Sequence, residues 1–139
     1  MSIEENKEIN RRVVEEVLNK GNIDLIDELY DENYIGHMPP DEIKGSEGQK
    51  QLFSQFRNGF PDLKITIQDQ IAEGDMVSSR QTFTGTHKGE FQGIAPTGKK
   101  VEITVTVVGR FANGKYVESW VNMDALGMMV QLGVVPPPK

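Results

Sequence analysis

The first part of the chain carries apolar residues at helical spacing. Over residues 3–19 they recur every three or four positions among polar side chains, which predicts one amphipathic helix. A shorter helix is predicted over residues 22–30, with Asn22 as its cap. A third is predicted over residues 46–59, where Ser46 and Gln49 have the spacing of a capping box.

From residue 62 onward the apolar period changes to two, which is the period of a half-buried strand. Asn113-Gly114 is a strong hairpin signal and joins two alternating segments. The predicted segments of this part are strands at 63–72, 77–88, 101–112 and 116–124, a loop at 89–98 and a final helix at 125–132. Between the helices, residues 33–37 predict a short strand and residues 38–41 a Pro-containing loop.

These elements predict an α+β fold with one domain over residues 1–135, followed by a proline-rich tail at 136–139. The formal net charge is -6 and no Lys/Arg cluster stands out, so we expect neither nucleic acid nor a membrane as partner. No apolar run approaches the roughly 20 residues of a membrane span, and the first residues are acidic. We therefore expect a cytoplasmic protein.

The sequence also restricts the chemistry of a site. It contains no Cys, which excludes disulfides, thiolate nucleophiles and thiolate metal ligands. The two His lie far apart in sequence without a metal-ligand spacing, so we expect no metal. The glycines between residues 85 and 98 form neither a GxGxxG motif nor a Walker loop, so we expect no nucleotide cofactor.

The hairpin allows a more specific expectation. With Asn113 and Gly114 as the central turn residues, Val107 faces Trp120, Val105 faces Asn122, and Ile103 faces Asp124. The carboxyl of Asp124 would then point to the apolar side, where burial raises the pKa of an acid and suits it to acid–base catalysis. The alternative is that Asp124 only caps the final helix, and residue types alone favour this slightly.

Several segments in this order resemble SnoaL-like polyketide cyclases over nearly the whole chain. The segments are Asn19-Lys20-Gly21-Asn22-Ile23-Asp24, Phe60-Pro61-Asp62-Leu63, Ile71-Ala72-Glu73-Gly74-Asp75, Gly85-Thr86-His87, Gly89-Glu90-Phe91, Gly93-Ile94-Ala95-Pro96-Thr97-Gly98-Lys99, and Trp120 with Asp124, Leu126, Gln131, Leu132 and Gly133. The resemblance implies the nuclear-transport-factor-2-like fold, a cone of helices and a strongly curved, mostly antiparallel sheet around a deep pocket. It also implies a cofactor-free intramolecular aldol ring closure, with Asp124 as acid and base.

Other residues are candidates for the same pocket. His87 shares strand parity with Phe83 and is a candidate catalytic group, although a hydrogen bond to a loop explains it equally well. The candidate ligand contacts are His37, Trp120, Asn122, Phe56, Phe83 and Val105, of which the aromatic residues fit a plain core as well.

The expected partners are a small apolar organic ligand and a second copy of the chain, since the outer sheet face is rich in Ser and Thr. The expected chemistry is that of a lyase or isomerase. Three alternatives stay open: a ligand-binding protein without chemistry, a ketosteroid-isomerase-like proton shuttle, and an epoxide-hydrolase-like enzyme.

Overall fold

One curved sheet and the helices on its two faces make up the structure, a computed structural model that describes residues 2–137. The strands follow the order β2-β1-β6-β5-β4-β3, with β1 and β6 parallel and the other neighbours antiparallel. The strands are β1 (Tyr30–Met38), β2 (Asp41–Lys44), β3 (Lys64–Glu73), β4 (Met76–Thr86), β5 (Lys100–Ala112) and β6 (Lys115–Met123). The helices are α1 (Ile3–Arg12), η1 (Val13–Asn19), η2 (Ile23–Leu25), α2 (Ile26–Leu29), α3 (Gly45–Gly59) and α4 (Ala125–Leu132).

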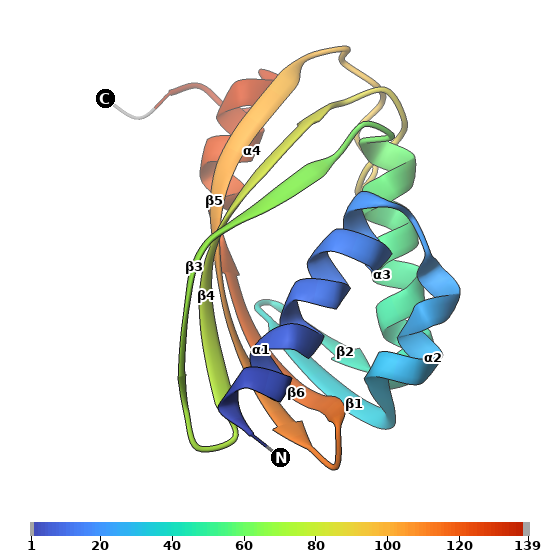
Figure 1. Ribbon diagram of the computed structural model, residues 1–139. Helices are drawn as coiled ribbons and strands as arrows, with labels where there is room; N and C mark the ends of the chain where they lie inside the picture. Colours follow the sequence, from blue (N-terminus) through green and yellow to red (C-terminus); the bar gives the residue numbers. More distant parts are fainter. Residues whose placement is uncertain (1, 138–139) are drawn as a thin grey trace.

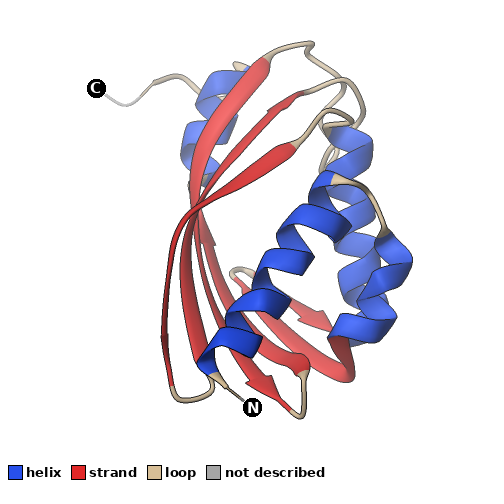
Figure 2. Cartoon of the chain, viewed as in Figure 1, coloured by secondary structure: helices blue, strands red, loops and turns tan. Residues whose placement is uncertain are grey.

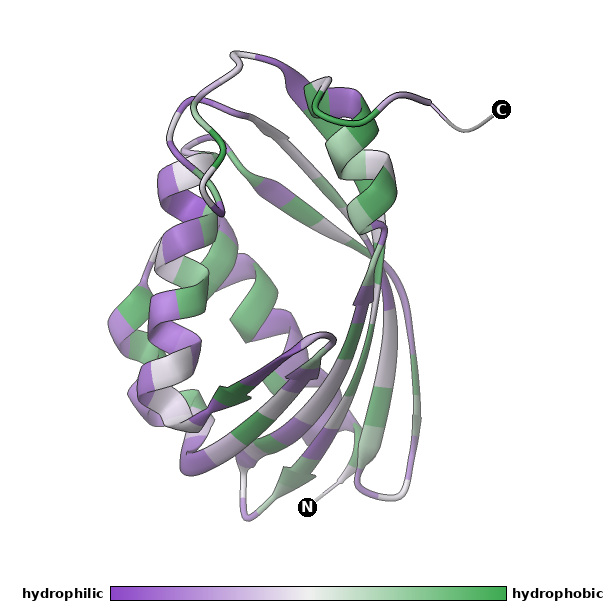
Figure 3. Ribbon diagram, turned by 180° about the vertical axis from the view of Figure 1, so that it is seen from behind, coloured by the Kyte–Doolittle hydropathy of each residue, from purple (hydrophilic) through white to green (hydrophobic). Residues whose placement is uncertain are grey.

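The layers confirm the predicted α+β class. Helices α1, α2 and α3 lie against the concave face of the sheet, whereas α4 lies on its other face (Figure 1). All helices except α4 precede β3 in the chain, and β3 to β6 follow one another before α4. Figure 2 shows these helices and strands in different colours. Apolar and polar bands alternate along the strands, as expected for a sheet with two different faces (Figure 3).

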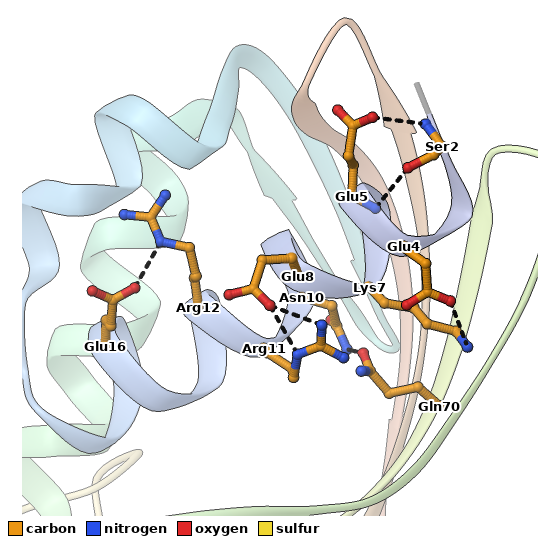
Figure 4. A network of polar contacts seen from close by, with 10 residues as sticks. All are labelled: Ser2, Glu4, Glu5, Lys7, Glu8, Asn10, Arg11, Arg12, Glu16 and Gln70. Atoms are coloured by element: carbon orange, nitrogen blue, oxygen red, sulfur yellow. Dashed lines mark hydrogen bonds and ion pairs between the residues drawn. The ribbon is translucent and has the colours of Figure 1, made fainter.

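The first helix begins with a capping box that the sequence analysis did not predict. The Ser2 hydroxyl accepts a hydrogen bond from the Glu5 amide, and the Glu5 carboxylate accepts one from the Ser2 amide (Figure 4). The box predicted at Ser46 and Gln49 is wrong, since α3 begins at Gly45 and both residues are buried. The side-chain amide of Gln49 instead donates to the Tyr30 hydroxyl.

The second half of this helix is wider than an ordinary α-helix. From Val13 to Asn19 the chain forms a π-helix, where the apolar pattern predicted a regular helix. The side chain of Asn19 fixes the end of this helix to the sheet. Its Nδ2 donates to the backbone carbonyl of Ile65, and its Oδ1 accepts from the backbone N–H of Ile65. Arg57 of α3 donates to the carbonyls of Leu18 and Asn19. These contacts hold helix η1, helix α3 and strand β3 together at one end of the fold.

Strand β1 is longer than predicted, and β2 had no counterpart in the sequence reading. β1 begins at Tyr30, so the predicted second helix ends one residue earlier, at Leu29. Residues 41–44, of which the predicted loop included only Asp41, form a short antiparallel partner of β1. The polar run at 31–33 hid the strand, because only part of β1 is buried.

The hairpin of β5 and β6 contains a bulge that changes its predicted register. Next to the turn, Phe111 pairs with Tyr116, as predicted, but Arg110 pairs with Glu118 and leaves Val117 as an extra residue. Beyond the bulge Val107 therefore pairs with Val121 rather than with Trp120. The same shift pairs Val105 with Met123, and the backbone amide of Asp124 donates to Thr104.

Among the described residues, no helix has the length and apolar character needed to cross a membrane. Residues 136 and 137 of the predicted tail form neither helix nor strand, and Pro138 and Lys139 lie outside the described residues.

Candidate functional site

A pocket lies between the concave face of the sheet and helices α1, η1 and α3. The space not occupied by protein atoms is about 750 Å³, part of it open to solvent. Most of its lining is apolar. The apolar lining residues are Val13, Val14, Leu18, Met38, Ile43, Leu52, Phe53, Phe56, Ile65, Phe83, Val105, Val107, Val121 and Met123.

The polar groups of the pocket are neutral. They are the side-chain amides of Asn10, Gln49 and Gln81, the hydroxyl of Ser119, and the hydroxyls of Tyr30, Tyr34 and Tyr116. No Asp, Glu, His, Lys or Arg belongs to the described lining. Two amides are held from outside the pocket, because Asn10 donates to Gln70 of β3 (Figure 4) and Gln81 donates to Ser79. The pocket therefore offers hydrogen bonds without offering a charge.

Three tyrosines gather at one end of the pocket, which we call the tyrosine end (Tyr30, Tyr34 and Tyr116). The rings of Tyr30 and Tyr116 are stacked at 5.0 Å, and Tyr34 meets the other two edge-on at 4.8 and 5.8 Å. Tyr34 forms a short hydrogen bond with the Ser119 hydroxyl. A Cβ at Gly109 would lie 2.5 Å from the Tyr116 hydroxyl, so this strand position must lack a side chain.

Burial keeps these phenols protonated. It raises the pKa of Tyr34 to about 12, against a smaller opposing effect of the hydrogen bond with Ser119. Burial also raises the pKa of Tyr30 and of Tyr116 well above the ordinary value of a phenol. At neutral pH the tyrosine end therefore presents uncharged hydroxyl groups.

Three of the predicted ligand contacts lie where the sequence analysis expected them. Phe56 of α3, Phe83 of β4 and Val105 of β5 all belong to the pocket lining. Phe56 and Phe83 also pack on each other, with ring centroids 5.9 Å apart. Their positions are consistent with ligand contact and with the ordinary core role weighed from the sequence.

The other three predicted contacts lie on the opposite face of the sheet. His37 and Trp120 stack there at 5.4 Å, and Asn122 is exposed. The bulge at Val117 places Trp120 and Asn122 outside, because each residue beyond it points to the face opposite the one predicted. Ser119, Val121 and Met123 take the pocket side instead.

His37 takes part in a chain of hydrogen bonds on this outer face. Its Nε2 lies 2.7 Å from the Glu118 carboxylate, whose other oxygen lies 3.0 Å from Arg110. The hydrogen bond with His37, followed by that from Arg110, lowers the pKa of Glu118. A His and a carboxylate in contact can serve as an acid–base pair, but His37 and Glu118 are not part of the pocket lining.

Asp124 does not face the pocket. Its side chain is exposed, and its carboxylate accepts a hydrogen bond of 2.8 Å from the Gly127 amide at the start of α4. The prediction that strand pairing turns this carboxyl toward Ile103 is wrong, because the register beyond Val117 differs by one. Of the two alternatives given by the sequence, the structure shows the helix cap.

His87 is fully buried beyond the end of β4 and also lies outside the pocket lining. Its Nδ1 accepts a hydrogen bond from the Thr97 amide at 3.2 Å, and its ring packs on Phe60. Its backbone pairs with Lys99 and Gly98, so it fixes the loop that follows β4. The structure thus shows the alternative in which His87 is hydrogen bonded to a loop. In this position its ring does not line the pocket.

The polar groups of the pocket were mostly missed from the sequence. Gln81 has the same strand parity as Phe83, which was a usable signal. Ser119 could not be found without the bulge, the predicted second helix included Tyr30, and Gln49 was expected to act in a capping box. Within residues 2–137, no group of three or more His, Asp or Glu side chains is arranged to hold a metal ion.

Comparisons with known proteins agree on one family. A family model described as SnoaL-like polyketide cyclase matches residues 8–132. A candidate polyketide cyclase from Acidithiobacillus ferrooxidans is similar in structure with a TM-score of 0.83 and 32% identity, over 96% of this chain and 99% of that chain. IdmH, a candidate polyketide cyclase from Streptomyces antibioticus, has a TM-score of 0.80 and 30% identity over 92% and 98% of the two chains.

A third similar structure carries a different description. AclR from Streptomyces galilaeus, described as a candidate hydroxylase, has a TM-score of 0.87 and 29% identity, over 99% of this chain and 87% of that chain. No curated protein matches the sequence. These neighbours bear out the predicted fold and family, while their descriptions name more than one kind of reaction.

The cap role of Asp124 makes a stability prediction. Asp124→Ala is expected to lower the free energy of unfolding by ~1 kcal/mol and the melting temperature by roughly 3 °C, since the Gly127 amide loses its acceptor. Asp124→Asn, whose side chain caps helices equally well, is the matched control and should remain near the wild type. Thermal unfolding of both variants checks this, and equal losses in the two would show that the carboxylate has another role.

Proposed function

We propose that this chain, which belongs to the SnoaL-like polyketide cyclase family, binds a small, neutral and largely apolar organic molecule in its pocket. The observation that carries the proposal is the lining itself. It combines a large apolar surface with neutral amide and hydroxyl groups, and its described members include no charged side chain. Small-molecule sites commonly combine apolar walls with a few hydrogen-bonding groups.

The lining also selects the charge of the ligand. A carboxylate placed in this pocket would lose its hydration without meeting a cation, which costs several kcal/mol. A ketone, ester or hydroxyl compound avoids that cost, because the phenols and amides can donate to its oxygen atoms. We therefore infer that neutral carbonyl or hydroxyl compounds bind, and that the matching acids bind poorly.

Two naphthalene derivatives test this selection by isothermal titration calorimetry at pH 7. We expect 2-acetylnaphthalene to bind, and 2-naphthoate to bind at least about tenfold more weakly because its carboxylate finds no partner. Tighter binding of the carboxylate would contradict a neutral pocket.

A matched pair of variants locates the binding. Val107 faces the pocket and its neighbour Val108 faces the other side of β5, where it pairs with Trp120. Val107→Phe should fill the pocket and abolish binding of 2-acetylnaphthalene, whereas Val108→Phe should leave its affinity within about twofold of the wild type. Equal loss in both variants would place the ligand elsewhere.

A second candidate function is cofactor-free ring closure of such a ligand, and membership of the family favours it. In an intramolecular aldol reaction an α-carbon bonds to a carbonyl carbon, and the proton lost from the first is gained by the new alkoxide. On this candidate the pocket supplies orientation and neutral hydrogen-bond donors rather than a carboxylate. The proton shuttle and the epoxide hydrolase each need a carboxylate beside the ligand, and the described lining provides none.

The test of ring closure begins with native mass spectrometry of the purified protein, which identifies any compound that copurifies with it. If that compound is turned over, Val107→Phe should abolish the rate and Asp124→Asn should keep it, since Asp124 lies outside the pocket. Loss of turnover in a stably folded Asp124→Asn variant would restore the catalytic role that the sequence suggested for this acid.

The outer sheet face supports a further part of the proposal, a homodimer. It exposes Thr104 and Thr106 beside Trp120 and His37, and Ile35 is 37% exposed there. We expect analytical ultracentrifugation to show a dimer that Thr106→Glu weakens at least about tenfold, because each copy would bury a new charge. A monomer at every concentration would contradict this expectation.

A further inference from the structure

Three buried polar side-chain atoms among the described residues have no hydrogen-bond partner. They are Asn6 Oδ1, Gln49 Oε1 and His87 Nε2. Of these residues, Gln49 alone belongs to the lining of the pocket. A buried polar atom without a partner costs roughly 1–3 kcal/mol, so the position of this one within a pocket indicates what the pocket receives.

The Gln49 side chain is fixed at its other end. It is 5% exposed, and its Nε2 donates a hydrogen bond of 3.2 Å to the hydroxyl of Tyr30, which is itself buried. Turning the amide by 180° would exchange the two ends, so that Oε1 meets Tyr30 and Nε2 lacks a partner. In either orientation one end of the amide lacks a hydrogen-bond partner within the protein.

The neighbouring groups define the surroundings of that free end. Tyr30 packs against Tyr34 and Tyr116, so Gln49 lies beside the tyrosine end of the pocket. Tyr34 is already hydrogen bonded to Ser119, and the other pocket amides, Asn10 and Gln81, donate to Gln70 and Ser79. Each of the three pocket amides thus donates one hydrogen bond, and Gln49 is the one whose oxygen is both buried and without a partner.

We propose that the Gln49 amide, beside the tyrosine end, binds a hydroxyl group of the ligand. A hydroxyl both donates and accepts, so it satisfies the amide in either orientation, whereas a ketone oxygen satisfies only one. This inference rests on the proposed function and narrows its ligand class to neutral apolar compounds that carry an alcohol or phenol at one end. Gln49 then distinguishes such compounds from apolar molecules of the same shape.

A two-by-two measurement tests the proposal. The probes are 2-naphthol and 2-methylnaphthalene, which have similar shape and differ in the hydroxyl, and the variant is Gln49→Met, which keeps the side-chain length. We expect the variant to weaken binding of 2-naphthol about five- to tenfold, because one hydrogen bond is lost. Binding of 2-methylnaphthalene should stay within about twofold or improve, since the free end of the amide is no longer buried without a partner.

Gln81→Met is the control, since Gln81 is a pocket amide with the same number of side-chain hydrogen bonds whose oxygen is not among the buried atoms that lack a partner. It should change both affinities equally. A Gln49→Met variant that weakens both probes equally, or a loss specific to 2-naphthol in Gln81→Met, overturns the Gln49 subsite and leaves the proposed function standing. Failure of both probes to bind the wild type overturns the two together.

A crystal structure of the wild type with 2-naphthol needs no variant and settles the case where Gln49→Met fails to fold. The proposal expects the naphthol oxygen within hydrogen-bonding distance of the Gln49 amide. An oxygen that lies at the phenylalanine end of the pocket, near Phe56 and Phe83, overturns it.

Discussion

The side chains that strand β6 presents to the pocket depend on one extra residue in its hairpin with β5. Because side chains alternate along a strand, the bulge at Val117 turns every later residue of β6 to the other face. Ser119, Val121 and Met123 thereby line the pocket, while Trp120 and Asn122 point away from it. Asp124 ends the strand as the cap of α4 rather than as a buried acid. The chemistry of the pocket thus follows from a backbone feature.

A neutral pocket has consequences for what the protein does. In the proposed function, its walls give an apolar ligand most of its binding free energy, and its amides and phenols orient that ligand by hydrogen bonds. The acid–base pair that the chain does contain, His37 with Glu118, lies on the other face of the sheet. Family membership and a shared fold therefore fix the kind of site but not the reaction. Within such a site, we propose that the Gln49 amide favours ligands that carry a hydroxyl group.

The sequence predicted the fold well where periodicity is strong. The alternation in β3, β4 and β5, the Asn113-Gly114 turn and the final helix all occur as expected. The site was predicted only in part, because its residues depend on geometry without a local signal. No side-chain pattern marks Val117 as a bulge, and the alternation from Tyr116 onward reads equally well in the unshifted register. β1 was shortened for a related reason, since its polar start at Asp31 suggested neither a strand nor a pocket wall.

Cysteine accessibility along β6 tests the central claim most directly, because the chain has no cysteine of its own to interfere. Single substitutions Ser119→Cys, Val121→Cys and Asn122→Cys would be treated with a water-soluble thiol reagent, with and without 2-acetylnaphthalene. We predict slow labelling at 119 and 121 that the ligand slows further, and fast labelling at 122 that the ligand does not change. Fast labelling at 119 and 121, with ligand protection at 122, would contradict the register and with it the neutral pocket.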